Sequence, residues 1–360
     1  MSLPQACYIS RFQDAPHGHG GNRRTRQMAQ ALRKLGVSVL ALADVPLGEA
    51  FEARHPLFSS DPEFDSIYGF NNYIRHMLLK DSGLALLVRG SPPQVAVVDD
   101  PVFFPQTMQA LQQGGTRVLA VLHNLEAFLP RSIQFSAQWE LLRLEVDILR
   151  QCTLTVTISR EDAFFLENMG VACHFFPYHP EEGEERRFVR IRETRRESDK
   201  AFFLTLGTAY NPPTLAGMRA LAERWSGISG GRARLIVAGF GTDRFLGNPG
   251  RGGLVSVRGG VSGEELDQLL IHARACILHQ EQGSGALTKI PELLLAGVPI
   301  MGSRHAARSY SALPGVTEYQ DFRELQTILA EGSAEKKLPA DPPRPDVEGM
   351  LGRILHTLKS

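Results

Sequence analysis

The sequence predicts an α/β protein made of two doubly wound, Rossmann-like domains. Short apolar segments bounded by turn residues alternate with longer segments of helical periodicity along the chain. The short segments are apolar almost throughout rather than alternating, which is typical of parallel strands that helices cover on both faces. The chain has 360 residues, a length that suits two domains that each bury a core.

Apolar segments of strand length occur in both halves of the chain. In the first half we expect strands over residues 6–10, 37–42, 95–98, 117–122 and 154–158. In the second half we expect them over residues 201–206, 234–238, 254–258, 275–278 and 299–302. Strands that are separated by helices in this way indicate one parallel sheet in each half.

Several helix ends carry recognisable signals. Ser262 followed by Glu265 fits a capping box, in which each side chain binds a backbone N–H group of the other residue. Ser159 follows a predicted strand and is expected to cap the next helix. A helix that begins near Asn22 is expected to end at Gly36, because glycine readily takes the left-handed conformation that terminates helices.

Composition shifts divide the chain into four expected parts, a first domain over 1–180, a connector over 181–200, a second domain over 201–340 and a final helical segment over 341–360. The connector is rich in Glu and Arg and poor in apolar residues, which predicts a solvated segment. The alternative is that residues 186–196 form a basic patch for an acidic acceptor or a lipid headgroup, and so a peripheral membrane contact.

Charge and composition exclude several classes of protein. Lys plus Arg and Asp plus Glu both number 39, which argues against a general attraction to nucleic acid. An apolar content of 43% with 22% charged residues is typical of a soluble globular protein. No apolar run reaches the length of a membrane span, and the first residues lack the features of a secretory signal. The 4 cysteines show no metal-site or redox spacing, so we expect a reducing, cytoplasmic location.

The segment 283–299 joins a small-residue loop to a short apolar helix and then to a new strand. Backbone N–H groups of the loop and of the helix start would face one point, which predicts a phosphate site. Thr288 is expected to cap this helix and Gly297 to end it. Lys289 and Glu292 share one helix face, so a cation would meet a diphosphate while a carboxylate accepts from sugar hydroxyls. The alternative is a tight glycine turn with Glu292 as a helix cap.

Three further glycine motifs each follow a predicted strand. They are Leu206-Gly207-Thr208 with Asn211, Gly239-Phe240-Gly241, and Gly259-Gly260-Val261. In order and spacing, these motifs and the 283–299 loop resemble the nucleotide-sugar domain of GT-B glycosyltransferases, specifically the retaining group called family four. The resemblance covers residues 207–302 and implies two Rossmann-like domains that face a cleft. It also implies that the helix in 341–360 packs back on the first domain.

The resemblance implies that a nucleoside diphosphate sugar is the donor and co-substrate, with no other cofactor and no metal ion. Glu292 would accept hydrogen bonds from the ribose, and backbone near Val261 would meet the base. Lys289 would add positive charge at the diphosphate. The other residues that the resemblance implies at the donor are Gly207, Thr208, Asn211, Gly239, Gly241, Gly283, Ser284, Gly285, Ala286 and Leu287.

Two positions depart from the pattern of the family. Ser284 stands where the first of the family's paired glutamates is expected, 8 residues before Glu292. The arginine that usually follows the first strand of the second domain is absent from residues 208–210. A leaving diphosphate needs a cation to stabilise its developing charge. Either Lys289 serves alone, or an arginine from elsewhere in the chain replaces the missing one.

The first domain carries a glycine loop over residues 16–22 that is similar to the family's first glycine loop, which approaches the donor phosphate and the acceptor. Gly20 and Gly21 let a ligand come close to the backbone. Arg24 lies at the positive end of the next helix, where an anionic ligand would explain it; the alternative is a solvated basic face. His123 ends a predicted strand and resembles the family histidine that borders the transferred sugar; the alternative is a structural histidine.

Asp99 and Asp100 end another predicted strand and are expected either to bind the acceptor or to orient a loop. With His123, Lys289 and Glu292 as implied catalytic residues, the resemblance implies a retaining, metal-independent, hexosyltransferase-like glycosyltransferase. It would move a sugar from a nucleoside diphosphate to a hydroxyl acceptor such as a glycan or glycolipid. The alternative is a relative with impaired catalysis that acts as a nucleotide-sugar-binding or partner subunit. A dehydrogenase is disfavoured, because the glycines at 239 and 241 lack a third glycine and a ribose-binding acid at the expected distance.

Overall fold

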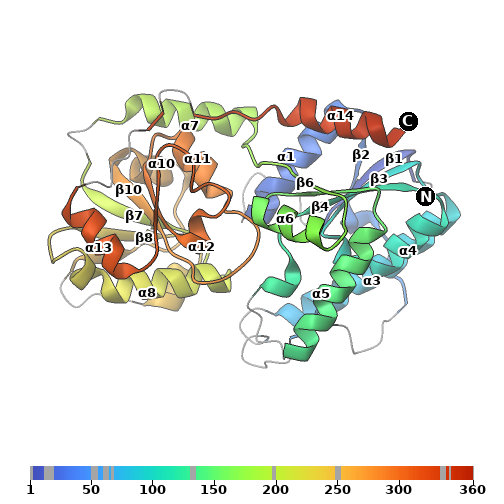
Figure 1. Ribbon diagram of the computed structural model, residues 1–360, viewed down its shortest axis with the longest axis horizontal. Helices are drawn as coiled ribbons and strands as arrows, with labels where there is room; N and C mark the ends of the chain where they lie inside the picture. The colour runs from blue at the N-terminus through green and yellow to red at the C-terminus, as the bar shows by residue number, and fades with distance from the viewer. Residues whose placement is uncertain are drawn as a thin grey trace. The chain divides into compact units, whose positions relative to one another are not determined.

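The protein is described by a computed structural model that forms two compact units, each built on one parallel sheet (Figure 1). Unit 1 contains Met1–Tyr178 and Pro345–Ser360, and unit 2 contains His179–Arg344. The α/β fold class expected from the sequence is confirmed. The residues that the structure describes are 3–11, 20–49, 56–59, 65, 69–129, 135–196, 200–247, 253–332, 338–339 and 342–359.

The sheet of unit 1 has 6 parallel strands in the order β2-β1-β3-β4-β5-β6. The chain moves outward from β1 to β2, returns past β1, and then continues through β3 to β6 on the other side. Ala6 pairs with Val95, which sets the register of β1 and β3. The strands are β1 (Ala6–Ile9), β2 (Ser38–Leu40), β3 (Val95–Asp99), β4 (Arg117–Leu122), β5 (Leu154–Thr157) and β6 (Cys173–Phe175).

Helices cover both faces of this sheet (Figure 1). Because side chains alternate along a strand, Tyr8 packs on the side of α1 and α14, whereas Cys7 and Ile9 pack on the side of α3 to α6. The α-helices are α1 (Gly20–Lys34), α3 (Phe70–Gly90), α4 (Pro105–Gln113), α5 (Phe135–Arg150), α6 (Arg160–Asn168) and α14 (Val347–Lys359). Short 3-10 helices are η1 (Leu42–Asp44), η2 (Pro101–Phe103) and η3 (Glu126–Phe128).

The sheet of unit 2 also has 6 parallel strands, in the order β12-β11-β10-β7-β8-β9. The chain starts at the centre in β7, runs outward through β8 and β9, and then returns to β10 on the other side of β7. The strands are β7 (Phe202–Leu206), β8 (Leu235–Ala238), β9 (Val255–Val257), β10 (Ala273–Leu278), β11 (Ile300–Ser303) and β12 (Val316–Tyr319). This order is the one of a Rossmann fold.

The faces of the second sheet are also covered (Figure 1). Phe203 packs with α8 and α13, and its neighbours Phe202 and Leu204 pack with α7, α10 and α11 on the opposite face. The helices of unit 2 are α7 (Glu182–Thr194), α8 (Pro212–Ile228), α9 (Thr242–Leu246), α10 (Gly263–His272), α11 (Lys289–Leu295), α12 (Arg304–Ala307) and α13 (Phe322–Ala330).

Every strand expected from the sequence is present, with ends that differ by at most two residues. The strands β6 and β12 were not expected. Both lie at an edge of their sheet and carry polar residues, His174 in β6 and Glu318 in β12. A strand covered on fewer sides does not need the continuous apolar sequence that marks a central one.

Most of the expected helix signals are confirmed. The hydroxyl groups of Ser159 and Ser262 each accept a hydrogen bond of 3.1 Å from the backbone N–H three residues later. Gly36 and Gly297 have φ values of 77° and 70°, as left-handed helix terminators do. The expectation that Thr288 caps α11 by its side chain is wrong. Its backbone is already helical, whereas a capping side chain needs an extended residue, and it makes no capping hydrogen bond.

The expectation of a solvated connector over 181–200 is wrong for the part that forms α7. Phe188 and Ile191 lie three residues apart on one helix face and are buried in the core of unit 2, against α10 and α11. Arg187 lies 2.6 Å from Asp267 of α10 and so holds the helix to the same unit. These side chains were too few to mark the segment as amphipathic beside its many charges.

The C-terminal helix α14 belongs to unit 1. Leu351, Leu355 and Leu358 are buried in the core that covers the α1 face of the first sheet. Lys34 of α1 forms an ion pair with Glu348 of α14. Unit 1 therefore combines the first part of the sequence with residues 345–360. In the part of the chain that the structure describes, no helix is both long and apolar enough to cross a membrane.

Candidate functional site

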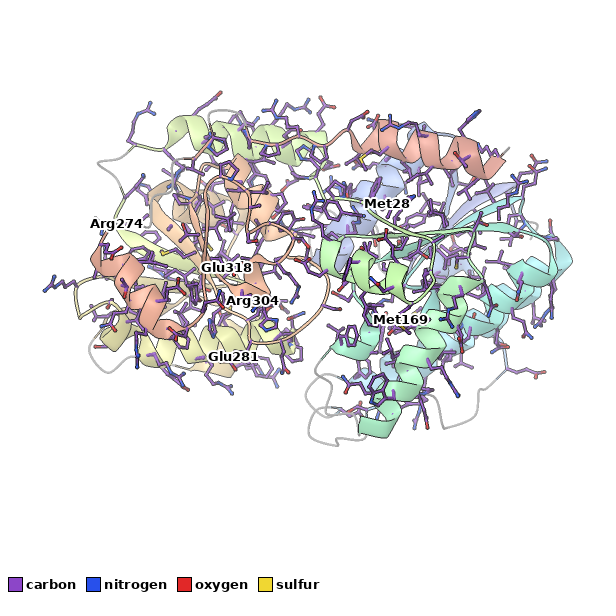
Figure 2. All side chains as sticks on the ribbon, viewed as in Figure 1. Met28, Met169, Arg274, Glu281, Arg304 and Glu318 are labelled. Carbon is purple, nitrogen blue, oxygen red and sulfur yellow. The ribbon has the colours of Figure 1, made fainter. Side chains whose placement is uncertain are left out.

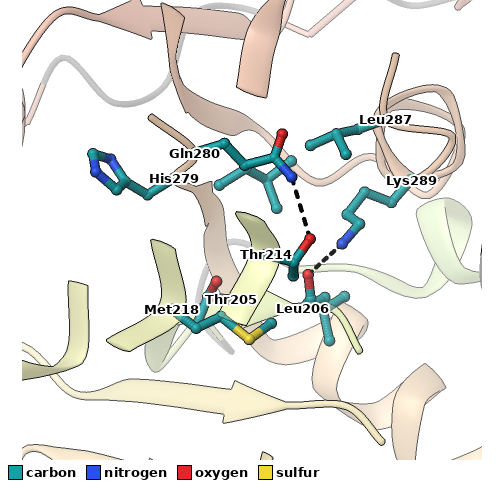
Figure 3. Close-up of a pocket in the computed structure, with 9 residues that line it drawn as sticks. Thr205, Leu206, Thr214, Met218, His279, Gln280, Leu287 and Lys289 are labelled. Atoms are coloured by element: carbon teal, nitrogen blue, oxygen red, sulfur yellow. Dashed lines mark hydrogen bonds between the residues drawn. The ribbon is translucent and has the colours of Figure 1, made fainter. Parts of the chain in front are cut away.

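A small pocket opens in unit 2 at the carboxyl ends of β7 and β10 (Figure 3). These two strands flank the point where the strand order reverses, so the loops that follow them diverge and leave room between them. Ligands of doubly wound sheets bind at such points. The pocket is lined by Thr205, Leu206, Thr214, Met218, Leu278, His279, Gln280, Leu287 and Lys289.

The motif after β7 and the motif after β8 are in direct backbone contact. A Cβ atom on Gly239 would lie 1.7 Å from the carbonyl oxygen of Gly207, so a side chain at 239 is excluded. The φ value of Gly239 is 143°, which L-residues rarely adopt. The N–H group of Gly239 donates to the carbonyl of Gly259 at 2.7 Å, which adds the motif after β9. Three of the sequence motifs thus meet at one edge of the sheet.

The other glycine and apolar residues of these motifs lie around the same edge. A Cβ atom on Gly241 would lie 2.8 Å from the ring of Tyr210, so this glycine lets the loops after β7 and β8 close together. Val261 is half-buried and packs against the core on the α10 and α11 face. The ring of Phe240, between the two glycines, is 70% exposed.

Thr208 and Asn211 shape the loop that enters α8. The hydroxyl of Thr208 accepts from the N–H group of Tyr210 at 3.2 Å. The side-chain carbonyl of Asn211 accepts from the N–H group of Thr214 at 3.1 Å and caps α8. Both residues that we expected at the donor therefore have a structural role in the loop.

Lys289 connects α11 to the first glycine motif. Its Nζ atom donates to the carbonyl oxygen of Leu206 at 2.6 Å (Figure 3). The same Nζ atom would lie 2.9 Å from a Cβ atom on Gly207. The ammonium group therefore stands at the end of β7, where the sequence motif predicted a cation. An ammonium group has three N–H donors, so a bond to Leu206 does not exhaust it.

Glu292 lies one helical turn after Lys289 and is 5% exposed. Both side chains come from α11, as their spacing predicted. Lys289 lines the pocket, whereas Glu292 is not among the lining residues. The burial of a carboxylate is unfavourable unless polar groups compensate for the lost water. The two residues therefore place one cation and one acid in the first turn of α11.

The glycine loop after β10 is held by an arginine that the sequence analysis did not identify. Arg308 follows α12 and donates from Nη1 to the carbonyl of Gly283 at 2.9 Å and from Nη2 to that of Ser284 at 2.7 Å. Its Nε atom donates to the carbonyl of Gly285. The only sequence signal was its position shortly after a predicted strand end, because the partners are 23 to 25 residues away.

The residues of this loop differ in their burial. Ser284 and Gly285 are buried, whereas Ala286 and Leu287 are half-buried and pack against the core on the α11 face. Leu287 also lines the pocket. The backbone of this loop, rather than its side chains, is therefore its polar part.

Gln280, which lines the pocket, is a second residue that sequence reasoning missed. Its Nε2 atom donates to the hydroxyl of Thr214 at 3.2 Å (Figure 3). Its Oε1 atom is buried and finds no hydrogen-bond partner among the described residues. A buried acceptor of this kind is a contact point for a ligand or an ordered water molecule. Its neighbour His279 stacks on Phe322 at 4.4 Å, and burial lowers the pKa of the His279 imidazole.

Unit 1 has a polar cluster at the matching point of its own sheet, where β1 and β3 end. Oδ2 of Asp99 accepts from the hydroxyl groups of Tyr8 and Thr25 and lies 3.3 Å from Nε2 of His123. Burial raises the pKa of Asp99, but the nearby His123 and the hydroxyl donors outweigh it and hold this pKa below its usual value. His123, which follows β4, is therefore paired with the buried carboxylate of Asp99 at the end of β3.

Asp100 orients the loop that carries His123. It has a φ of 44°, and its carboxylate accepts from the backbone N–H of His123 at 2.9 Å. Arg11 binds the same carboxylate at 2.9 Å and Glu126 at 2.7 Å. Of the two roles that we expected for Asp99 and Asp100, loop orientation is the one that these contacts show.

Arg24 is part of the core of unit 1 rather than of a solvated basic face. It is fully buried, and its guanidinium donates to the carbonyls of Phe176 at 2.9 Å and Pro177 at 3.0 Å. The periodicity of α1 turns position 24 toward β6 rather than toward solvent. Gly20 and Gly21 form the first turn of α1, and the rest of the expected loop, residues 12–19, lies outside the described part.

Known proteins resemble this chain in fold but not in sequence. No protein-family model matches the chain, and no curated protein matches its sequence.

Among the described residues, no three His, Cys, Asp or Glu side chains are grouped as metal ligands.

Solved structures resemble the chain over nearly its whole length. Sucrose-phosphate synthase from Thermosynechococcus elongatus is 14% identical, with a TM-score of 0.65 and coverage of 99% of both chains. Starch synthase IV from Arabidopsis thaliana, solved as its catalytic domain with ADP and acarbose, is 10% identical, with a TM-score of 0.60 and 99% of both chains covered. The Anabaena protein HepE, solved with UDP, is 11% identical, with a TM-score of 0.56 and the same coverage. The shared fold confirms the two Rossmann-like domains of the GT-B type.

Proposed function

We propose that this protein is a glycosyltransferase that moves a sugar from a nucleoside diphosphate to a hydroxyl acceptor, and that unit 2 binds the donor. One observation carries the proposal. The glycine motifs after β7, β8 and β9 pack backbone on backbone, and Lys289 joins them at the reversal point of the sheet. Loop N–H groups and a cation at such a point suit a diphosphate. The N–H groups of Gly207 and Gly239 already bond to Ala238 and Gly259, so we assign the phosphate contacts to the loop over 283–286. The similarity to structures solved with UDP and with ADP supports the same class of ligand.

In this proposal each group has one task. The loop N–H groups and Lys289 stabilise the negative charge that grows on the leaving diphosphate. Glu292 accepts hydrogen bonds from the ribose hydroxyls, because a carboxylate is an acceptor that fits a pair of adjacent hydroxyl groups. Gln280 offers a further acceptor at the pocket wall. The protein thus contributes position and electrostatics to the transfer.

The finer features of the reaction follow from the family resemblance alone. We propose transfer with retention of the anomeric configuration, in which the leaving phosphate itself takes the proton of the acceptor hydroxyl. We propose a hexosyl group and no requirement for a metal ion, so a chelator is expected to leave the rate unchanged. On the acceptor side we assign His123, whose imidazole is oriented by Asp99.

A second candidate is favoured by two departures from the family pattern. Ser284 stands where the resemblance calls for a carboxylate, and the arginine expected after β7 is missing. A chain with these changes would bind a nucleotide sugar and act as a binding or partner subunit. Slow hydrolysis of the donor separates the candidates, because an active transferase transfers some sugar to water.

Isothermal titration calorimetry with UDP, GDP and ADP tests the donor site. We expect one of the three to bind, and both Glu292→Gln and Lys289→Met to weaken it by about ten- to hundredfold, as expected when a hydrogen bond to a charged group is removed. Glu264→Gln changes an exposed glutamate in the first turn of α10 and is the matched control. Wild-type affinity in both site variants would refute the assignment of the site.

A further inference from the structure

Arg308 binds three consecutive peptide carbonyls with one guanidinium group. Nη1 donates to Gly283, Nη2 to Ser284 and Nε to Gly285. The side chain is half-buried and reaches these carbonyls from the end of α12. The planar fork of an arginine can bind several acceptors at once, which the single ammonium of a lysine cannot do in the same geometry.

The three bonds fix the direction of three peptide planes. The peptide bonds here are trans, and in a trans peptide the C=O and N–H groups point in opposite directions. The carbonyls of residues 283, 284 and 285 share their planes with the N–H groups of Ser284, Gly285 and Ala286. With the carbonyls aimed at Arg308, these N–H groups face the other side of the loop.

Both glycines of the loop are needed for this arrangement. The φ values of Gly283 and Gly285 are 128° and 72°, which residues with a side chain rarely adopt. A Cβ atom on Gly283 would also lie 3.3 Å from Nη2 of Arg308, so glycine gives the guanidinium its access. The glycines permit the conformation, and Arg308 selects it.

We propose that Arg308 is a positioning residue of the donor site, which holds the loop so that the N–H groups of Ser284, Gly285 and Ala286 face the diphosphate. The proposal rests on the donor site assigned above. Arg308 itself does not touch the donor in this role. Its effect is confined to the loop N–H groups that face the phosphates, so it contributes to the affinity for a nucleoside diphosphate and not to that for the nucleoside.

The test compares ligands with and without phosphate in the full chain. The tightest of UDP, GDP and ADP is titrated into Arg308→Met and Arg308→Lys, together with its nucleoside. We expect both variants to lose about ten- to hundredfold in diphosphate affinity, the range for lost hydrogen bonds to a charged group, and to bind the nucleoside as the wild type does. Arg308→Lys keeps the charge, so its failure to restore affinity assigns the effect to geometry.

Arg304, exposed on the same helix (Figure 2), provides the control as Arg304→Met, which is expected to bind both ligands normally. Diphosphate affinity that is unchanged in both Arg308 variants would overturn the positioning role and leave the donor site standing. An equal loss of nucleoside and diphosphate would overturn it as well, since a damaged unit 2 loses both. A wild-type chain that binds none of the three diphosphates would overturn the donor site itself. Should Arg308→Met not fold, Arg308→Lys with both ligands decides alone.

Discussion

Gly217 in α8 lies directly against the carbonyl oxygen of His279 at the end of β10. A Cβ atom built on Gly217 would be 1.7 Å from that oxygen, well inside van der Waals contact. The close approach sets the height of α8 over the sheet next to the pocket, and the pocket is lined by Thr214 and Met218 of the same helix. The absence of a side chain at Gly217 thus allows α8 to pack this close to the end of β10 beside the pocket.

Gly217→Ala is expected to destabilise the protein, although alanine is normally the better helix residue. The added Cβ must push α8 away from β10, and overpacking of this kind costs about 1–3 kcal/mol, more than the gain in helix propensity. Thermal unfolding measures the loss. Gly227→Ala changes a glycine of the same helix that has open space around it, so it is expected to raise stability by up to about 1 kcal/mol. Equal effects of the two changes would contradict the contact with His279.

Arg24→Met is expected to lower the stability of unit 1 without affecting donor binding. The change leaves the carbonyls of Phe176 and Pro177 without their donor, and a hydrogen bond to a charged group contributes about 2–3 kcal/mol. Thermal unfolding and nucleoside diphosphate titration check the two halves of the prediction. Arg33→Met, at an exposed position of α1, serves as the control. Loss of diphosphate binding at unchanged stability would contradict this prediction and indicate that Arg24 contributes to the ligand site.

Asp81 gives unit 1 a pH dependence of unusual sign. It is buried on α3, and its carboxylate accepts from the N–H groups of Gln106 at 2.9 Å and Thr107 at 2.8 Å at the start of α4. Burial raises the pKa of Asp81 to about 6, although these hydrogen bonds oppose the shift. Between the pKa of an unfolded Asp, about 4, and this value, the folded state holds the proton that the unfolded state releases.

The contribution of Asp81 to the free energy of unfolding therefore decreases as pH rises from about 4 to 6, by about 3 kcal/mol in order of magnitude, and is constant outside that window. Asp81→Asn cannot titrate, so its stability relative to wild type is expected to be higher at pH 7 than at pH 4. Urea unfolding of both proteins at the two values measures this difference, and other titrating groups cancel in it. A difference that does not change with pH would show that Asp81 titrates normally.

The sequence predicted much of the fold because its signals are local. A parallel strand covered on both faces must be apolar along its length, and the central strands such as β4 and β10 were found from that property. The edge strands β6 and β12 escaped because their exposed positions tolerate polar residues such as His174 and Glu318. Helix α7 lies in the segment that the sequence predicted to be a connector. Its two buried side chains among many charges give only a weak hydrophobic periodicity.

The glycine motifs of the proposed donor site could be predicted from the sequence, whereas the side chains of Arg308 and Gln280 could not. Gly207, Gly239 and the residues around Gly283 were recognisable, because glycine marks positions where backbone approaches backbone. Arg308 was not recognisable, because its three partners lie far from it along the chain. The sequence predicted an anionic ligand or a solvated face for Arg24, but the residue is buried against Phe176 and Pro177, because a charge at a helix start does not reveal what packs against it.

By itself, the sequence determined the α/β class, the central strands of the two parallel sheets, and the glycines that close the loops at their carboxyl ends. These follow from local chemistry, namely which residues can line a strand and which can take a positive φ. Only the tertiary structure decided where the charged side chains point. A guanidinium or carboxylate goes wherever acceptors or donors compensate its lost water, and those partners are brought close only when distant segments pack.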